Sequence, residues 1–290
     1  MTDLMPTQRR IAAELQVADS FDAAGEIERR VVFLADRLVD TGLTALVLGI
    51  SGGVDSTTAG RLCQLAAERA RAAGHPAVFV AMRLPYGVQA DEHHAQAALA
   101  FIRPDRVLTV DVQPASDATQ DALVAAGLTF TDAAQQDFVH GNVKARQRMI
   151  AQYAVAGAMG GLVVGTDHAA EAVTGFFTKH GDGAADVVPL TGLTKRRVRA
   201  LAQALGAPAE LVGKAPTADL ESLTPGKLDE DALGLTYEQI DDFLEGRPVP
   251  AEVAAALAAR YRATDHKRCL PIAPPVSADD PVTAAVPAQH

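Results

Sequence analysis

The sequence predicts an α/β fold, in which a parallel, twisted sheet is flanked by helices on both faces and followed by a helical C-terminal extension. Short, continuous apolar runs, which are typical of strands buried on both faces, recur along the first 165 residues. Stretches with helical periodicity separate these runs, and such alternation requires the crossover connections of a parallel sheet. The last third of the chain carries clear helix-capping signals.

The first helix is expected over 20–40, where Ile27, Val31 and Leu34 recur at helical spacing between charged residues. The first buried strand follows over 44–50. Further elements are then expected as helices over 55–73, 90–102 and 132–159, the last with a break near Gly141 left open, and as strands over 77–82, 106–111 and 161–165. In the C-terminal third, helices are expected over 195–205 after a Thr194 cap, after a Thr236/Gln239 capping box, and over 252–264.

Composition and charge narrow the class of protein. The 290 residues are 48% hydrophobic and 21% charged, which fits one domain spanning 1–290 with a core over about 20–270 and fraying ends. The net charge of −10 argues against a nucleic-acid binder. Cys63 and Cys269 are isolated, so neither a disulfide scaffold nor a zinc site is expected. With no signal peptide or membrane span in the sequence, we expect a cytoplasmic protein.

The loop from Gly49 to Ser56 (Gly-Ile-Ser-Gly-Gly-Val-Asp-Ser) joins the first strand to a helix. Gly52 and Gly53 let the backbone approach a ligand closely, and the helix N-terminus that follows favours an anion. The lysine of a Walker A loop is missing. Although a plain Gly-rich turn is an alternative, the string resembles the signature loop of the ATP pyrophosphatases, or PP-loop enzymes. That resemblance implies binding of the ATP β- and γ-phosphates and release of AMP and pyrophosphate.

A second dense stretch, Gly165 to Asp186, follows the fourth strand and therefore lies at the same edge of the sheet. It resembles the corresponding region of the bacterial NAD synthetases, and five further segments resemble that family in the same order. These segments are Leu84–Asp91, Gly141–Arg146, Ala215–Glu221, Leu235–Tyr237 and His266–Arg268. The resemblance covers the chain from the first helix to Arg268 and implies the adenine nucleotide alpha hydrolase-like fold.

The resemblance also implies the role of each residue. ATP would be bound by Gly49, Ile50, Ser51, Gly52, Gly53, Val54, Asp55, Ser56, Arg83, Gln89, Thr166, Lys195 and Thr217. Deamido-NAD would be bound by Arg146, Lys179, Asp186, His266 and Lys267. Asp55 and Glu171 would hold Mg²⁺. Since the deamido-NAD residues come from distant parts of the chain, family members place that site at the interface of a homodimer.

The residues themselves leave alternatives open. A carboxylate beside a phosphate loop suits a bridging Mg²⁺, but Asp55 could also cap the helix. Lys195 opens a helix, where the dipole disfavours a cation unless an anion such as phosphate lies nearby; it could also belong to a solvated basic face. His266 and Lys267 could be a pair of cations at a helix C-terminus. Phe176 and Phe177 are open between the core and a platform for the nicotinic ring.

The expected reaction is the ATP-dependent amidation of deamido-NAD through an acyl adenylate. Lys195 and the loop amides would neutralise phosphate charge, Asp186 is a candidate proton acceptor for ammonium, and the 216–225 segment would close over the site. About forty residues precede the first strand, too few for the nitrilase-like domain of glutamine-dependent relatives, so ammonia is the expected nitrogen donor. The competing hypotheses are a tRNA-modifying PP-loop enzyme and a non-catalytic nucleotide-binding module.

Overall fold

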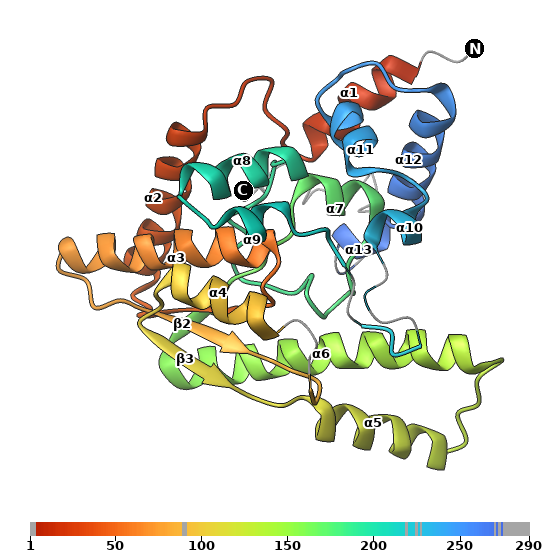
Figure 1. Ribbon diagram of the computed structural model, residues 1–290, viewed down its shortest axis with the longest axis horizontal. Coiled ribbons are helices and arrows are strands. Elements are labelled where there is room, and N and C mark those ends of the chain that lie inside the picture. The colour runs from red at the N-terminus through yellow and green to blue at the C-terminus, as the bar shows by residue number, and fades with distance from the viewer. Residues whose placement is uncertain are drawn as a thin grey trace.

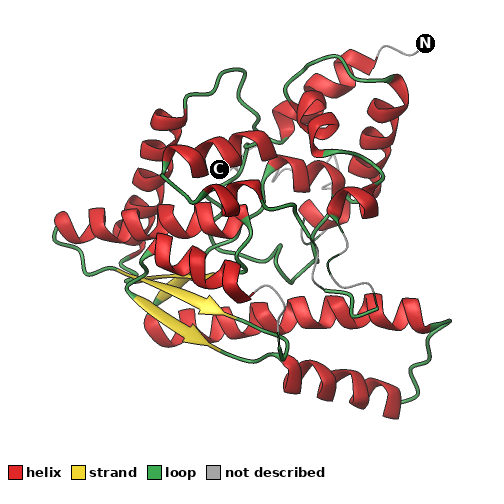
Figure 2. Cartoon of the chain, in the orientation of Figure 1, coloured by secondary structure: helices red, strands yellow, loops and turns green. Residues whose placement is uncertain are grey.

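The computed structural model describes residues 4–88, 92–217, 220–223, 226, 228–269, 271 and 274. Its sheet holds β1 (Ala45–Gly49), β2 (Val78–Arg83), β3 (Arg106–Thr109) and β4 (Gly161–Val163) in the order β3-β2-β1-β4. All three strand pairings are parallel, as the alternation of strands and helices predicted. Most of the rest of the chain is helical, and the strands gather in one region of the molecule (Figure 2).

The two faces of the sheet are covered by different helices. Leu46, Leu48 and Ile50 belong to the core that faces α2 (Ala23–Thr41), α3 (Val54–Ala72) and α8 (Lys195–Ala204). Val47 belongs to the opposite core, where α6 (Ala133–Met159) packs on the sheet (Figure 1). Alternate residues of one strand thus reach opposite layers, which is why β1 is apolar along its whole length.

The long helix α6 is continuous, so the break considered near Gly141 does not occur. A side chain at Gly141 would instead have its Cβ 3.1 Å from the Cβ of Leu220, in a loop that crosses the helix. The glycine therefore provides close approach for that loop. Helix α5 (Gln113–Ala125), which the sequence analysis did not anticipate, packs along α6 (Figure 1).

A second helical layer contains α1 (Leu4–Glu14), α7 (Ala169–Thr174), α11 (Tyr237–Leu244) and α12 (Ala251–Ala263), which share one core. Helix α1, at the N-terminal end of the chain, lies beside α11 and α12 (Figure 1). The side chain of Gln8 donates a 2.7 Å hydrogen bond to the carbonyl of Phe243, and Ile11 is buried in the shared core. The sequence analysis had placed the start of the core near residue 20, and α1 extends it.

The predicted caps are present. Thr194 accepts from the backbone N–H of Arg197 at the start of α8, and Thr236 and Gln239 form the reciprocal capping box of α11. The short helices α9 (Ala209–Gly213), α10 (Asp229–Leu233) and α13 (Asp265–Arg268) complete the C-terminal part, and α4 (Glu92–Ile102) lies between β2 and β3 in the chain. Within the described part of the chain, every helix is too short or too polar to serve as a membrane span.

Candidate active site

The loop between β1 and α3 is shaped by its own side chains. Gly52 has a φ of 88°, and a Cβ there would lie 2.7 Å from the backbone nitrogen of Ala95, so only glycine fits against α4. The hydroxyls of Ser51 and Ser56 lie 3.1 Å apart across the loop, and the N–H of Gly53 donates to Ser51 Oγ at 3.3 Å. The loop's own serine hydroxyls therefore fix its shape at the N-terminus of α3.

Asp55 lies in the first turn of α3 but does not cap it. The N-cap residue is Gly53, which has no side chain, and the Asp55 carboxylate makes no cap hydrogen bond. The Oδ2 atom of Asp55 instead accepts a 2.7 Å hydrogen bond from the ammonium of Lys195. The capping alternative is thus wrong, and Asp55 faces a cation contributed from 140 residues away.

Lys195 opens α8 and points inward, with a side chain that is only 1% exposed. Its Nζ lies 3.5 Å from Nε2 of His168 and 4.9 Å from the centre of the Tyr237 ring. The carboxylate of Asp241 accepts from the backbone N–H groups of Lys195 and Arg196 at 3.0 and 2.7 Å, which orients the start of the helix. The solvated-face alternative for Lys195 is therefore wrong.

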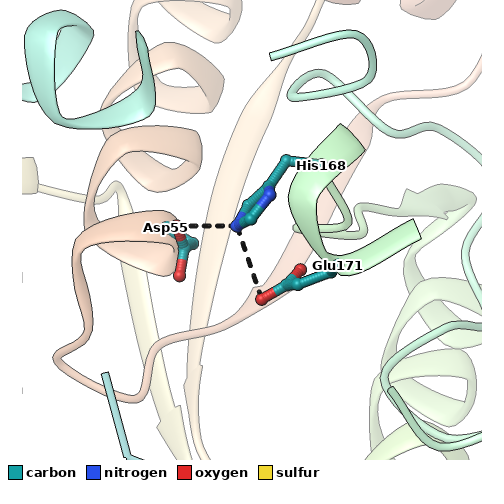
Figure 3. Close-up of side chains that lie close together, drawn as sticks. All are labelled: Asp55, His168 and Glu171. Carbon is teal, nitrogen blue, oxygen red and sulfur yellow. Dashed lines mark ion pairs between the residues drawn. The ribbon is translucent and has the colours of Figure 1, made fainter. Parts of the chain in front are cut away.

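Helix α7 contributes the third and fourth members of this cluster (Figure 3). His168 is its N-cap residue and Glu171 follows within the first turn. The His168 Nε2 atom lies 3.5 Å from Asp55 Oδ1 and 3.5 Å from Glu171 Oε1, so the imidazole stands between the two carboxylates. Figure 3 shows the three side chains converging from α3 and α7.

The cluster fits a divalent cation. One ligand atom each from Asp55, His168 and Glu171 lies within 4.8 Å of the others. Asp55 Oδ1 is buried and has no hydrogen-bond partner among the described residues, and His168 Nε2 lies 3.5 Å from it. Carboxylate oxygens are the ligands that Mg²⁺ prefers, so Asp55 and Glu171 suit that ion better than the imidazole does.

Burial and neighbouring charges push the two carboxyl groups in opposite directions. Burial raises the pKa of Asp55, but the attraction and hydrogen bonding of Lys195 and His168 together outweigh burial and hold that pKa well below its ordinary value. Burial, against the opposing attraction of His168, raises the pKa of Glu171 to about 8. The free protein therefore favours the ionised form of Asp55 and the protonated form of Glu171. Further positive charge, such as a bound cation, would favour ionisation of Glu171 as well.

These groups open into one cavity of about 450 Å³ at the carboxyl ends of the strands. The predicted residues that line it are Gly49, Ile50, Ser51, Gly53, Val54, Asp55, Ser56, Arg83, Thr166, Glu171, Lys195, Thr217 and Lys267. Phe176 and Phe177 line it as well, and Phe176 also packs on the second helical core. The predicted phosphate and ATP residues are thus brought together, apart from Gly52, which backs onto α4, and Gln89, which lies outside the described residues.

Arg83 is buried at the end of β2 and is already engaged. Its guanidinium donates to the carbonyl of Ile50 and to the carboxylate of Glu92, the latter at 2.6 Å. It therefore ties the start of the phosphate loop to the first turn of α4.

Four predicted deamido-NAD residues do not line the cavity of the single chain. Arg146 is exposed on α6 and donates to the carbonyl of Lys179 at 3.2 Å. Asp186 accepts from the N–H of Val163 at 2.7 Å, which completes the edge of β4. His266 is exposed on α13. Arg146, Lys179, Asp186 and His266 therefore lie at the outside of this chain.

Lys267 does reach the cavity, and it also stabilises the turn after α7. Its ammonium donates to the carbonyls of Gly175 and Phe177, both at 2.8 Å, and lies 5.3 Å from the Phe177 ring centre. Burial lowers the pKa of Lys267, against the attraction of Asp182. A cation at this position can contact a ligand while it closes the end of α7.

Sequence reasoning missed two groups that the structure adds to the site. His168 was not predicted as a site residue, although it stands between both carboxylates. Asp229 lines the cavity, is 7% exposed, accepts from the Tyr237 hydroxyl at 3.0 Å and keeps its Oδ1 without a partner among the described residues. The Gly165–Asp186 stretch signalled His168, whereas nothing in the sequence near Asp229 pointed to the phosphate loop.

The sequence profile of the family described as NAD synthase matches residues 26–271. A Streptomyces coelicolor protein named NH(3)-dependent NAD(+) synthetase is 77% identical over 267 residues, which cover 92% of this chain and 97% of that protein. A protein of the same name from Burkholderia mallei is 65% identical and covers 93% of this chain and 95% of its own length.

Two solved structures resemble the fold closely. The crystal structure of NAD+ synthetase from Burkholderia pseudomallei aligns with a TM-score of 0.82 and 63% identity, over 93% of this chain and 99% of that one. The structure of NMN synthetase from Francisella tularensis aligns with a TM-score of 0.76 and 33% identity, over 88% of this chain and 99% of that one.

Proposed function

This chain belongs to the NAD synthase family, and from that premise we propose how its cavity makes NAD. The chain is a C–N bond-forming ligase that amidates deamido-NAD with ammonia at the expense of ATP. The carboxylate of deamido-NAD attacks the α-phosphorus of ATP, which forms an acyl adenylate and releases pyrophosphate. Ammonia then attacks the acyl carbon and expels AMP. The convergence of Asp55, His168, Glu171 and Lys195 beside the phosphate loop is the observation that carries this mechanism.

The residues of the chain act mainly by position and charge. The Gly49–Ser56 loop lines the cavity at the N-terminus of α3, where the pyrophosphate would leave, and Lys195 supplies a buried positive charge beside Asp55. Asp55 and Glu171 would hold Mg²⁺, which supplies charge neutralisation at the phosphates when bound. His168 would keep the two carboxylates apart and oriented.

We also propose that the catalytic unit is a homodimer. Arg146, Lys179, Asp186 and His266 lie outside the cavity of their own chain, which supports a deamido-NAD site completed by the same residues of a second copy. A shared site would bring these groups to the carboxylate-bearing substrate without any rearrangement of the fold. The role of Asp186 as proton acceptor for ammonium and the closure of the 216–225 segment remain predictions, and residues 218, 219, 224 and 225 lie outside the described part of that segment.

We also propose that the protein is cytoplasmic. Cys63 is buried and Cys269 is exposed, and both are unpaired thiols, which fits a reducing compartment.

The decisive experiment incubates the protein with ATP, Mg²⁺, deamido-NAD and ammonium and follows NAD and AMP together. Equal amounts of NAD and AMP, lost in Asp55→Ala, are expected. Nicotinate mononucleotide serves as the control substrate because one structural relative is an NMN synthetase. AMP without NAD from deamido-NAD, or preferential amidation of the mononucleotide, would contradict the substrate assignment.

A further inference from the structure

The buried ammonium of Lys195 occupies the positive position beside Asp55 in the nucleotide-free protein. In the proposed function, a divalent cation binds at Asp55 and Glu171. On that basis we propose that Lys195 is the resident counter-ion of Asp55, that it excludes free divalent cation from the site, and that the metal therefore enters only together with the nucleotide. Lys195 would thus set the order of binding as well as contact the phosphates.

The geometry makes Lys195 a cation that cannot easily leave alone. Its side chain is 1% exposed and its Nζ lies 2.7 Å from Asp55 Oδ2, whose side chain is 18% exposed. A buried ammonium without a counter-charge is strongly destabilised, so the Asp55 contact is retained until another anion replaces it. Burial lowers the pKa of Lys195, but the combined attraction of Asp55, Glu171 and Asp229 outweighs burial and raises that pKa above its ordinary value.

A free divalent cation would meet this fixed charge. Lys195 already neutralises Asp55, and its Nζ lies 3.5 Å from the imidazole that separates Asp55 from Glu171. A dication bound to both carboxylates would be repelled by an ammonium within a few ångströms, in a buried setting where charges are poorly screened. The cluster is therefore well formed for a metal yet electrostatically closed to one that arrives alone.

The nucleotide changes this balance. Its triphosphate brings several negative charges to the Gly49–Ser56 loop, which contains Asp55 itself. The phosphates offer Lys195 a new partner and compensate the dication at the same time. Asp229 offers a second acceptor close to Lys195. It lines the same cavity, and its buried Oδ1 has no partner among the described residues. Its Oδ2 accepts from the hydroxyl of Tyr237, whose ring centre lies 4.9 Å from Lys195 Nζ.

The test measures binding of Mn²⁺ by electron paramagnetic resonance, with the whole protein and no nucleotide. The Lys195→Met variant keeps the length of the side chain and removes its charge. We expect it to bind free Mn²⁺ at least about tenfold more tightly than the wild type. The same substitution at Lys214, which also lines the cavity, is the matched control for loss of one charge and should give a much smaller gain. The double variant Asp55→Asn/Lys195→Met should lose the gain.

Equal Mn²⁺ affinity of wild type and Lys195→Met, or a gain that survives in the double variant, would overturn the proposal. A second comparison needs no change at Lys195. Nucleotide-free wild type and Asp55→Asn should bind Mn²⁺ equally weakly, whereas a non-hydrolysable ATP analogue should produce a Mn²⁺ site in the wild type alone. If Asp55→Asn weakens Mn²⁺ binding without nucleotide, free metal reaches Asp55 and the proposal is wrong. NAD formation by the wild type is measured separately, so this failure would leave the proposed function intact.

Discussion

The two ends of the cavity differ in how much of the site one chain supplies. At the phosphate end, Asp55, His168, Glu171 and Lys195 come from three helices and lie within hydrogen-bond or ion-pair distance of one another. At the other end, four of the five predicted deamido-NAD residues lie outside the cavity, and only Lys267 reaches it. The phosphate end of the cavity is thus built within one chain, whereas in the proposed function the substrate end is completed by a second copy of the chain.

This difference shows which charged groups the fold must pair within one chain and which it can leave in solvent. A cluster of buried charges must be fully paired inside one chain, because an unpaired member would destabilise that chain before any substrate arrived. Exposed side chains such as Arg146 and His266 change the folding stability little while they are solvated, so a dimer contact can position them later. Changes at the two ends should therefore have different signatures.

Removing the Asp55 carboxylate, at the phosphate end of the cavity, should have the largest effect on activity. We expect Asp55→Asn to lower kcat/KM for NAD formation at least ~10³-fold, because phosphate charge would no longer be neutralised by a held cation. The loss should be the same at every protein concentration. Rates from a coupled NAD assay check this, with Asp36→Asn on the exposed face of α2 as the matched control. A loss smaller than tenfold would show that Asp55 is not a metal ligand.

Substitutions of the predicted deamido-NAD residues should have smaller effects that are specific to that substrate. Arg146→Ala should lower kcat/KM for deamido-NAD about 10- to 100-fold by removing a charge-assisted contact, and should leave KM for ATP unchanged.

The same variant tests whether two chains share a site. If co-expressed Asp55→Asn and Arg146→Ala chains form mixed dimers, one of the two sites in each mixed dimer is intact, and about a quarter of the wild-type activity returns. Activity no higher than the mean of the two variants would place both residues in a site of one chain and break the comparison.

The loop over the cavity should show a smaller effect. Asp137 on α6 accepts from the N–H groups of Ser222 and Leu223 at 2.8 and 2.7 Å, next to Leu220 and Glu221, which line the cavity. Asp137→Ala should raise KM for ATP about 3- to 10-fold by releasing this tether. Steady-state kinetics check it against Gln136→Ala on the same helix, and an unchanged KM would mean that the tether does not matter for binding.

The buried charges at the phosphate end should make the stability of the fold depend on pH. The folded pKa of Glu171 is about 8 against an ordinary value of 4.5, so the folded chain binds this proton more tightly than the unfolded chain does. Stability is therefore lost as pH rises from about 4.5 through 8. Glu171→Gln cannot ionise, so without metal or nucleotide its Tm should match the wild type near pH 5 and exceed it by a few degrees at pH 8. Thermal unfolding in a chelator measures this, and a Tm gain that does not depend on pH would have another cause.

Most of the fold could be predicted because its strands are locally distinctive. Apolar runs bounded by turn residues located β1 to β4, and cap residues located α8 and α11. Helix α5 was missed because Ser116 is its only buried residue, so it lacks an apolar stripe, although it packs along α6. Helix α1 was missed because its buried face is matched by α11 and α12, more than two hundred residues later.

The site could be predicted where a motif is contiguous. The phosphate loop and the Gly165–Asp186 stretch placed Asp55 and Glu171 at one edge of the sheet, and the structure brings them together. The partner of Lys195 was predicted only as an anion, since the choice between phosphate and the Asp55 carboxylate depends on how α8 packs against α3. Asp229 joins the cavity through a loop whose path no local pattern specifies.

The docking of α1 has a consequence for how the chain is made. Gln8 contacts Phe243, 235 positions further on, so α1 cannot find its partners until more than two hundred further residues have been synthesised. Until α11 and α12 emerge, the partners that cover Ile11 in the folded chain are missing. The nascent polypeptide therefore exposes an apolar helix face during much of translation, and the docking of α1 is a late folding step.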